Sequence, residues 1–363
     1  MEKSQKSTKP INFKACILAA GIGSRNKYAK NFAKGLLPYK NKPLIFYILK
    51  TLPIEIEIIV AVGFQENLYR EFLPMAFPER TFTFVTIDHY HGEKSGPGHS
   101  LLCCENFLKN PFYLFPSDAY IDPRESLPRK DYNWVGLGST SKRRLSSYCL
   151  AEINQKGCIN RFIDKESNPD SKLKDNVFTG IAFINNYLEF FEGLKSDDVI
   201  NNEKQVSAGL NKLILKDLRA HSIASWKDLG TSSLYEINAL DDEGQNLLKP
   251  NEKTYLLGNK VFKYFEDTEI ISKKIKRANQ LKPLTPHIVD KGKNFFSYKK
   301  VPGHLLSEEV SGLILENFLN KCKTTLFNPI EVNRKEKKFY YDHCLYFYKD
   351  LTLKKIENYL KKF

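Results

Sequence analysis

The chain has 363 residues, of which 42% are hydrophobic and 13% aromatic. This composition can build the cores of two domains of ordinary size and excludes a disordered chain. The net charge is +14, and residues 251–363 contribute +10 of it, with 23 Lys and Arg against 13 Asp and Glu. Such a basic final third could bind nucleic acid or an anionic surface, but we favour the alternative, a solvated lysine-rich face.

The cysteines and the hydropathy of the chain indicate the cellular compartment of the protein. Seven cysteines occur, an odd number, without any Cys-x-x-Cys pair. Most stand in apolar surroundings, so we expect reduced, buried thiols and a cytoplasmic protein. No apolar run is long enough to span a membrane. Residues 1–10 are polar and lysine-rich, so we expect a flexible tail rather than a secretory signal.

Short apolar runs alternate with helical patterns over the first 240 residues. We predict strands and helices, in chain order, as follows: strand 13–20, helix 43–52, strand 56–62, helix 66–73, strand 82–87, helix 98–108 and strand 112–115. This alternation is typical of βαβ units. It predicts an α/β fold with a Rossmann-like, mixed but mostly parallel sheet, in which ligands gather at the carboxyl ends of the strands.

The pattern changes near residue 241. Gly258 and Asn259 form a favourable turn pair between two short strands. The expected elements are strands 253–257 and 261–265, a basic helix 269–281 and a strand 294–299. We therefore place a boundary at residues 240–250. The predicted organisation is a tail (1–10), a first domain (11–245) and a small α+β domain (246–363).

The first predicted strand runs directly into a glycine-rich loop, Leu18-Ala19-Ala20-Gly21-Ile22-Gly23-Ser24-Arg25. Two glycines allow backbone N–H groups to converge on a phosphate, and Arg25 adds guanidinium donors. Asn26 stands where a dinucleotide-binding loop has its third glycine, and no GxxxxGK[ST] motif is present. The loop alone is equally compatible with a phosphate site and with an ordinary strand-to-helix turn.

A lysine motif follows this loop at short range, Lys34-Gly35-Leu36-Leu37-Pro38 and then Asn41-Lys42-Pro43-Leu44-Ile45. The loop and this motif together resemble the opening of the sugar-phosphate and choline-phosphate nucleotidyltransferases. That family has LAAGxGxR, a lysine usually preceded by proline, and a KPLI-like helix start. Ala33 replaces the usual proline here, and Asn26-Lys27 replaces a hydrophobic residue. Neither change removes a charged group, and the resemblance extends over residues 1–240.

Nucleotidyl transfer is an in-line attack on the α-phosphorus of an NTP, so positioning and charge neutralisation do most of the work. Mg²⁺ in such sites is held by one or two carboxylates together with phosphates. The resemblance implies that Asp118 and Asp228 hold the metal, although either could instead be a helix cap or a turn residue. It also implies that Arg25 and Lys34 bind the triphosphate and are catalytic.

The segment Gly96-Pro97-Gly98-His99-Ser100 resembles the base-reading segment of the family. The implied nucleotide contacts are Leu18, Ala20, Gly21, Gly23, Ser24, Arg25, Gly96, Pro97 and Ser100. We interpret His99 as a helix-surface residue. His89 and His91 have no Cys or Asp at metal-ligand spacing, so we interpret them as polar loop residues rather than zinc ligands.

The acceptor side is also recognisable. Ile163-Asp164-Lys165 resembles the acidic residue and lysine that meet the acceptor phosphate, and Asn176-Val177-Phe178-Thr179-Gly180-Ile181 resembles the strand lining the acceptor pocket. The implied acceptor contacts are Tyr148, Asp164, Lys165, Thr179 and Gly180, with Lys165 catalytic; a surface lysine is the alternative. We also offer the segment 203–207 for acceptor contacts, although its residues give no physical reason for a role.

The basic hairpin and the helix after it resemble the small lobe of an aminoglycoside- or choline-kinase-like phosphotransferase. This resemblance makes Lys263 the ATP-phosphate lysine. Such a kinase also needs a catalytic Asp, an Asn and a metal-binding Asp in a large lobe. No such segment is recognisable after Pro302, where Asp342 and His343 come only twenty residues before the last one. We therefore expect a partial kinase-like domain without kinase activity.

These assignments predict an Mg²⁺-dependent enzyme that joins an NMP from an NTP to a phosphorylated sugar, polyol or amino alcohol and releases pyrophosphate. CTP is slightly favoured, because choline-phosphate-type transferase and kinase-like domains are paired in some bacterial proteins, and family analogy suggests capsule or surface-glycan precursors. The alternative is a non-catalytic module whose basic final third binds nucleic acid or an anionic polymer. We favour the enzyme because every charged position that the chemistry needs is filled. We expect no nucleic acid or membrane partner; base, acceptor and oligomeric state stay open.

Overall fold

The computed structural model describes residues 13–128, 131–164, 170–196, 200, 202–240, 251–304, 306, 308–326 and 331–360. The chain divides into two compact units, residues 1–300 and residues 301–363. The predicted tail and residues 241–250 of the predicted boundary lie outside the described residues. Residues 251–300 belong to the same compact unit as the residues before the predicted boundary.

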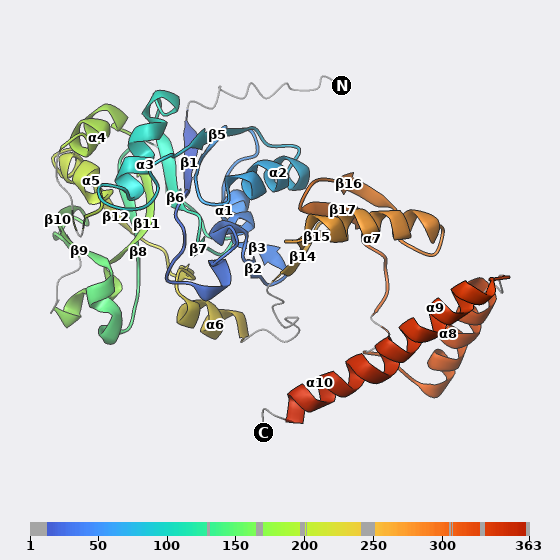
Figure 1. The fold of residues 1–363 in the computed structure, drawn as a ribbon. Helices are drawn as coiled ribbons and strands as arrows, with labels where there is room; N and C mark the ends of the chain where they lie inside the picture. The colour runs from blue at the N-terminus through green and yellow to red at the C-terminus, as the bar shows by residue number, and fades with distance from the viewer. Residues whose placement is uncertain are drawn as a thin grey trace, which may run out of the picture. The chain divides into compact units, whose positions relative to one another are not determined.

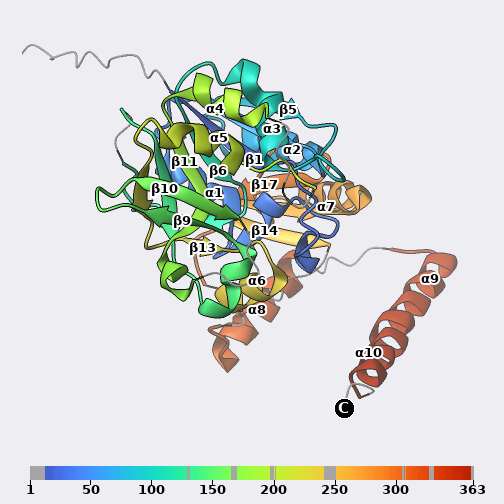
Figure 2. The ribbon, with the colours of Figure 1, turned by 90° about the vertical axis from the view of Figure 1, so that its left-hand side faces the viewer.

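A nine-stranded mixed sheet forms the centre of the first unit (Figures 1 and 2). Its parallel part has the order β6-β1-β4-β5, with β1 (Lys14–Ala19), β4 (Ile58–Val62), β5 (Phe82–Thr86) and β6 (Phe112–Pro116). On the other side of β6, antiparallel pairing begins with β11 (Val177–Ile184), which also contacts β8 (Trp134–Gly138) and β9 (Cys149–Ile153). The outer strands are β10 (Ile159–Asp164) beside β9 and β12 (Arg219–Ser222) beside β8. The predicted α/β fold with a mixed sheet is confirmed.

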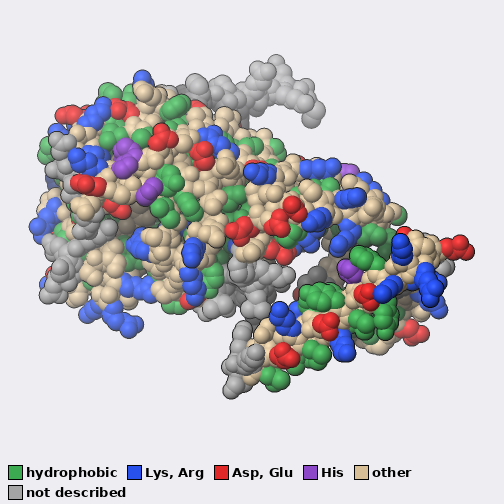
Figure 3. Space-filling view, viewed as in Figure 1, with side chains coloured by type: hydrophobic (Ala, Val, Ile, Leu, Met, Phe, Trp, Pro, Cys, Tyr) green, Lys and Arg blue, Asp and Glu red, His purple; other side chains and the backbone are tan. Residues whose placement is uncertain are grey.

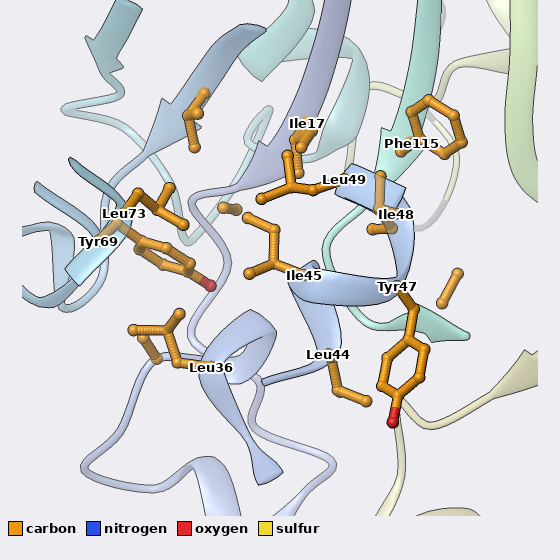
Figure 4. Close-up of a cluster of buried hydrophobic side chains, with 14 of the residues drawn as sticks. Ile17, Leu36, Leu44, Ile45, Tyr47, Ile48, Leu49, Tyr69, Leu73 and Phe115 are labelled. Carbon is orange, nitrogen blue, oxygen red and sulfur yellow. The ribbon is translucent and has the colours of Figure 1, made fainter. Parts of the chain in front are cut away.

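Helices cover both faces of this sheet (Figures 1 and 2). Alternate residues of β1 enter two different cores, with Ile17 in one and Cys16 in the other, as the two-residue period of a strand requires. The first core is covered by α1 (Leu44–Thr51) and α2 (Glu66–Ala76), and Figure 4 shows Ile45, Ile48 and Leu49 of α1 beside Ile17. The second is covered by α3 (Pro97–Cys104), α4 (Tyr187–Leu194) and α5 (Ser207–Ile214).

Short strands, turns and one further helix complete this part of the chain. A two-stranded antiparallel sheet pairs β7 with β13, and another pairs β2 with β3. The bounds are β7 (Ala119–Tyr120), β13 (Lys227–Asp228), β2 (Pro38–Tyr39), β3 (Lys42–Pro43), α6 (Ser232–Leu240) and the 3₁₀ turns η1 (Lys27–Ala29), η2 (Lys34–Leu36), η3 (Glu105–Phe107), η4 (Lys142–Ser147) and η5 (Ser171–Asp175).

A four-stranded antiparallel sheet follows, in the order β14-β15-β17-β16. Its elements are β14 (Glu252–Leu257), β15 (Lys260–Phe265), α7 (Thr268–Gln280), β16 (Ile288–Lys291) and β17 (Phe295–Lys299), so the predicted hairpin, basic helix and strand are confirmed. Phe72 of α2 packs against Tyr255, Phe262 and Phe295 of this sheet, with ring centroids 5.0–5.6 Å apart. The C-terminal sheet therefore shares a hydrophobic core with the first 240 residues, which the predicted division did not anticipate.

The second unit contains α8 (Gly312–Thr325), α9 (Arg334–Leu345), the π-helical turn η6 (Tyr346–Asp350) and α10 (Leu351–Leu360), none of which we predicted. Asn333 and Glu336 form a capping box at the start of α9, a strong helix-start signal that the sequence carried. Among the described residues, no helix has the length and apolarity to cross a membrane. On the face shown in Figure 3, basic and acidic side chains are interspersed.

The prediction of buried cysteines was only partly right. All seven cysteines fall within the described residues, and none of them forms a disulfide there. Cys16 and Cys104 are buried, Cys103 is exposed and the others are half-buried. Cys103 and Cys104 differ because consecutive residues of a helix point in directions about 100° apart. The apolar run around them therefore could not bury both.

Candidate active site

Two adjoining hollows lie at the carboxyl ends of β1 and β6. The first, of about 450 Å³, lies over the glycine-rich loop, and the second, of about 260 Å³, lies over β9 and β11. Leu18, Arg25, Pro97 and Pro116 line both hollows. The two spaces therefore meet at these residues, and ligands bound in them would be neighbours.

All nine residues predicted to contact the nucleotide line the first hollow, together with Lys34. Gly23 has φ +70°, and a Cβ there would lie 3.1 Å from the Cβ of Ala29, so the turn requires glycine. A Cβ on Gly21 would meet no atom within 4 Å. A ligand can therefore approach the backbone closely at Gly21, while Gly23 shapes the loop.

The second wall of the first hollow is the segment before α3. Gly96 has φ +113°, and a Cβ there would lie 2.8 Å from the carbonyl oxygen of Lys204. The N–H of Gly98 donates a hydrogen bond of 2.8 Å to the same carbonyl. These glycines are needed because the segment 203–205 packs directly on the backbone of the predicted base-reading segment.

Three charged side chains converge where the two hollows meet. The ammonium of Lys34 lies 2.5 Å from Oδ2 of Asp118. The pairing of β7 with β13 sets Asp228 opposite Ala119, and so brings the second carboxylate beside the first. A Cβ on Gly230 would lie 2.6 Å from Oδ2 of Asp118, 2.8 Å from Oδ1 of Asp228 and 3.2 Å from Nζ of Lys34. Residues separated by almost 200 positions thus surround one point.

Hydrogen bonds fix the orientation of both carboxylates. Burial favours the neutral form of Asp118, but the Lys34 ammonium, with a smaller contribution from Arg25, holds the pKa of that carboxyl below its ordinary value. Asp228 accepts 2.7 Å hydrogen bonds from the Tyr148 hydroxyl and from the N–H of Gly230. Burial and the Asp228 charge raise the pKa of Tyr148, so this phenol stays protonated as a donor.

The carboxylate pair matches the requirements of Mg²⁺. The described residues contain no group of three or more His, Cys, Asp or Glu that could hold a metal by themselves. A pair of hard oxygen ligands at the edge of a phosphate-sized hollow is nevertheless the arrangement that Mg²⁺ uses when substrate phosphates supply the remaining ligands. Asp118 and Asp228 are therefore the residues that fit this metal.

Four predicted acceptor residues line the second hollow, namely Tyr148, Asp164, Thr179 and Gly180. Asp118 and Asp228 line it as well. The Thr179 hydroxyl donates to the Gly136 carbonyl at 2.9 Å, so it supports the backbone. Asp164 accepts a 2.6 Å hydrogen bond from the Ser207 hydroxyl. Lys165 lies outside the described residues, and its predicted role stays a prediction.

Tyr90, Ser95 and His91 line the first hollow and were not predicted to do so; we took His91 for a polar loop residue. The segment 203–207, which we offered for the acceptor pocket without a role, contributes Glu203 to the first hollow and Gln205 and Ser207 to the second. Phe178, within the strand predicted to line the acceptor pocket, and Trp226 also line the second hollow. The segment 203–207 reaches the site because it packs on Gly96 and Gly98, a contact between distant segments that no local pattern signals.

Lys263 lies elsewhere, on the C-terminal sheet. Its ammonium donates to Thr254 Oγ1 at 2.7 Å and lies 3.4 Å from Glu252 Oε1, both on the neighbouring strand. Among the described residues that line the two hollows, Lys263 does not appear. Its assignment as an ATP-phosphate lysine stays a prediction.

No family model matches the chain. The bifunctional protein GlmU of Methanococcus maripaludis (strain C7 / ATCC BAA-1331) is 24% identical over 225 residues, which are 60% of this chain and 51% of that protein. The chain therefore spans about half the length of this curated relative.

Solved structures resemble a larger share of the chain. A putative glucose-1-phosphate thymidylyltransferase from Bacillus anthracis, in complex with a sucrose, has a TM-score of 0.52 and 21% identity over 66% of this chain and 98% of its own. A UDP-glucose pyrophosphorylase complexed with UDP-glucose has a TM-score of 0.53 and 20% identity over 63% of this chain and 98% of its own. The chain has the fold of these nucleotidyltransferases. The kinase-like lobe has no counterpart in these comparisons.

Proposed function

We propose that this chain is a nucleotidyltransferase that joins an NMP from an NTP to a phosphorylated small molecule and releases pyrophosphate. The observation that carries the proposal is the convergence of Lys34, Asp118 and Asp228 on one point between two hollows. One hollow has the backbone loop and basic side chains that suit a triphosphate, and the other accommodates a small acceptor. The similarity to named nucleotidyltransferases supports the same reaction class.

The proposed reaction assigns one role to each group. Gly21, Gly23 and Arg25 hold the triphosphate, and bound Mg²⁺ on Asp118 and Asp228 would neutralise phosphate charge. An oxygen of the acceptor phosphate forms a bond to the α-phosphorus as the bond from that phosphorus to the bridging oxygen breaks. Pyrophosphate leaves with that electron pair. Lys34 stabilises the negative charge that develops on the leaving group.

The acceptor is a phosphorylated sugar, polyol or amino alcohol. Phe178, Tyr148 and Trp226 line the second hollow, and aromatic rings suit both the apolar face of a sugar and a quaternary ammonium. The named relatives act on or bind sugar derivatives, which favours a sugar phosphate. We retain CTP as a slight preference and capsule or surface-glycan precursors as the proposed destination, with Lys165 proposed to orient the acceptor phosphate.

One screen tests this proposal. CTP, GTP, UTP and dTTP are each incubated with Mg²⁺ and a set of sugar, polyol and amino-alcohol phosphates, and pyrophosphate release is measured. The proposal predicts release that requires both substrates in at least one combination. Release that needs no acceptor would indicate an NTP hydrolase, and no release from any combination would contradict the proposal. Binding of nucleic acid with steep salt dependence, without any release, would favour the non-catalytic alternative.

A further inference from the structure

Three tyrosine hydroxyls hold the short segment that carries Lys34. The hydroxyl of Tyr69, on α2, accepts a 2.9 Å hydrogen bond from the N–H of Gly35. The hydroxyl of Tyr255, on β14, donates to the carbonyl of Leu36. The hydroxyl of Tyr235, on α6, donates to the carbonyl of Pro38. Residues 34–38 are thus fixed at three backbone atoms by elements from three parts of the chain, and Figure 4 shows Tyr69 reaching from α2 toward Leu36.

These hydroxyls are fully enclosed by protein. Each of the three side chains is 0% exposed. Burial raises the pKa of Tyr69, Tyr235 and Tyr255, so each phenol is neutral at physiological pH and keeps its hydroxyl proton. A buried carbonyl that loses such a donor cannot recover the bond from water, so the surrounding backbone shifts or the fold pays the full desolvation cost.

The contribution from β14 comes from the C-terminal sheet, beyond the residues that resemble nucleotidyltransferases. Besides the Tyr255 bond to Leu36, the N–H of Leu256 donates a 2.7 Å hydrogen bond to the carbonyl of Asn41. Asn41 has φ +57° and belongs to the tight turn between β2 and β3. Strand β14 therefore hydrogen-bonds to the lysine segment at Leu36 and to the following turn at Asn41.

The sheet is itself anchored on the first core. The Glu71 carboxylate on α2 accepts hydrogen bonds from the N–H groups of Asn294 and Phe295, at 2.9 and 2.8 Å. Phe72, the next residue of α2, packs against Tyr255 at 5.2 Å between ring centroids. Because α2 also supplies Tyr69, one helix aligns two of the three hydroxyls.

We propose that Tyr255 is a positioning residue for Lys34, which makes the C-terminal sheet a working part of the nucleotidyl-transfer site. This inference rests on the proposed function. Leu36 is two residues from Lys34, and the Lys34 ammonium must sit on the phosphate chain with near-atomic accuracy. A displacement of about 1 Å can cost a reaction up to about a hundredfold. The hydroxyl of Tyr255 prevents that displacement without touching either substrate.

The test compares Tyr255→Phe with Tyr264→Phe in the full chain. Tyr264 is a matched control, because it is a buried tyrosine of the adjacent strand, 3% exposed, whose ring packs on Phe32 and Phe295. We expect Tyr255→Phe to lower kcat roughly tenfold with KM for the NTP changed less than about twofold, since Lys34 acts on charge that develops in the transition state. Tyr264→Phe should leave both constants within about twofold of wild type.

Hydrogen exchange supplies a readout that does not depend on activity. Amides of residues 34–37 should exchange faster in Tyr255→Phe than in wild type or Tyr264→Phe, because the segment loses one of its three fixed points. Unchanged kcat in a folded Tyr255→Phe, or an equal loss in Tyr264→Phe, overturns the inference. If wild type shows no transfer at all, the proposed function fails, and unchanged exchange at residues 34–37 would separately overturn the positioning contact. Should Tyr255→Phe not fold, Tyr235→Phe, which frees the Pro38 carbonyl, is measured in its place.

Discussion

Two lysine–carboxylate pairs in this molecule differ in what surrounds them. Lys34 and Asp118 come from different segments, lie 2.5 Å apart, and meet a second carboxylate at the junction of two hollows. Lys263 and Glu252 lie 3.4 Å apart on neighbouring strands. A cross-strand ion pair of this kind is an ordinary stabilising contact of a sheet.

A lysine beside a carboxylate does not by itself indicate a site. At Lys34 the backbone is held by three buried hydroxyls, and Gly230 keeps the space between the charges clear. At Lys263 the partners are the strand's own neighbours, Thr254 and Glu252. Among the described residues, distant segments converge on an open hollow at Lys34 and not at Lys263. The following substitutions test this difference.

The largest effect is expected from Asp118→Asn. Removing a metal-binding carboxylate should lower kcat about a thousandfold, corresponding to roughly 4 kcal/mol of transition-state stabilisation. The free energy of unfolding should change by less than about 1 kcal/mol, because the amide fills the same space. Steady-state pyrophosphate release and urea denaturation measure the two quantities.

Asp122→Asn is the control for that substitution. Asp122 lies four residues further along and pairs with Arg124 at 2.7 Å, and the described lining of the two hollows does not include it. Its replacement should leave kcat within about twofold. A comparable loss of activity in both variants would show that charge in this segment, rather than the site, controls the rate.

Replacing the two loop glycines with alanine should affect different properties, NTP affinity at Gly21 and stability at Gly23. Gly21→Ala places a methyl group where no protein atom lies within 4 Å, so stability should change by less than about 0.5 kcal/mol. The methyl group occupies space beside the bound phosphates, so NTP affinity should fall about tenfold, a loss of about 1.4 kcal/mol. Gly23→Ala forces φ +70° on alanine and should cost about 1–2 kcal/mol of stability. Calorimetric NTP binding and thermal denaturation distinguish them, and an equal stability loss in both would contradict the proposed division of roles.

Lys253 provides a pH test within the C-terminal sheet. Its side chain is buried, and burial lowers its pKa to about 8 although Glu266 and Glu252 oppose the shift. Between that pKa and the ordinary value of 10.5 the unfolded chain binds more protons than the folded chain, so the free energy of unfolding rises with pH in this window. The cost of charging Lys253 is fully present below pH 8.

Lys253→Met should therefore stabilise the fold near pH 7 by on the order of 1 kcal/mol, after allowance for solvent screening. Its advantage over wild type should shrink as the pH rises from 8 toward 10.5. Urea denaturation of both proteins across this range measures the difference. A difference in the free energy of unfolding that does not depend on pH would mean that burial does not disfavour the charged form of Lys253.

The smallest effect is expected from Lys263→Met. If the comparison between the two lysine–carboxylate pairs holds, this change removes a cross-strand contact and leaves nucleotidyl transfer within about twofold of wild type, with at most about 1 kcal/mol lost in stability. Lys34→Met is the matched change at the other pair and should abolish most of the activity. A large loss of transfer in Lys263→Met would place the C-terminal lysine in the reaction.

Local patterns were sufficient for much of the fold. The strands that became β1, β4, β5 and β6 are short apolar runs with turn residues between them; the loop glycines follow β1 and Asp118 follows β6, whereas Asp228 lies in β13. Alternating strands and helices predicted that ligands gather at the strand ends. The roles of the loop, Asp118 and Asp228 were implied by the family resemblance.

Contacts between distant segments could not be predicted. His91 reaches the first hollow only through the path of its loop, and residues 203–207 reach the site through tight packing on Gly96 and Gly98. The contact of Tyr255 with Leu36 joins positions 219 residues apart. Helices α8 to α10 went unpredicted although α9 begins with a capping box.

Phosphorus-31 NMR of the reaction products distinguishes nucleotidyl transfer from hydrolysis of the NTP. Wild-type protein is mixed with Mg²⁺, the NTP and the acceptor phosphate that release pyrophosphate in the screen. We predict two coupled diphosphate resonances of a nucleotide-linked product, equal in amount to the pyrophosphate formed, and their loss in Asp118→Asn. A spectrum that contains only NMP or inorganic phosphate as new nucleotide-derived signals, or equal product formation by Asp118→Asn, would contradict it.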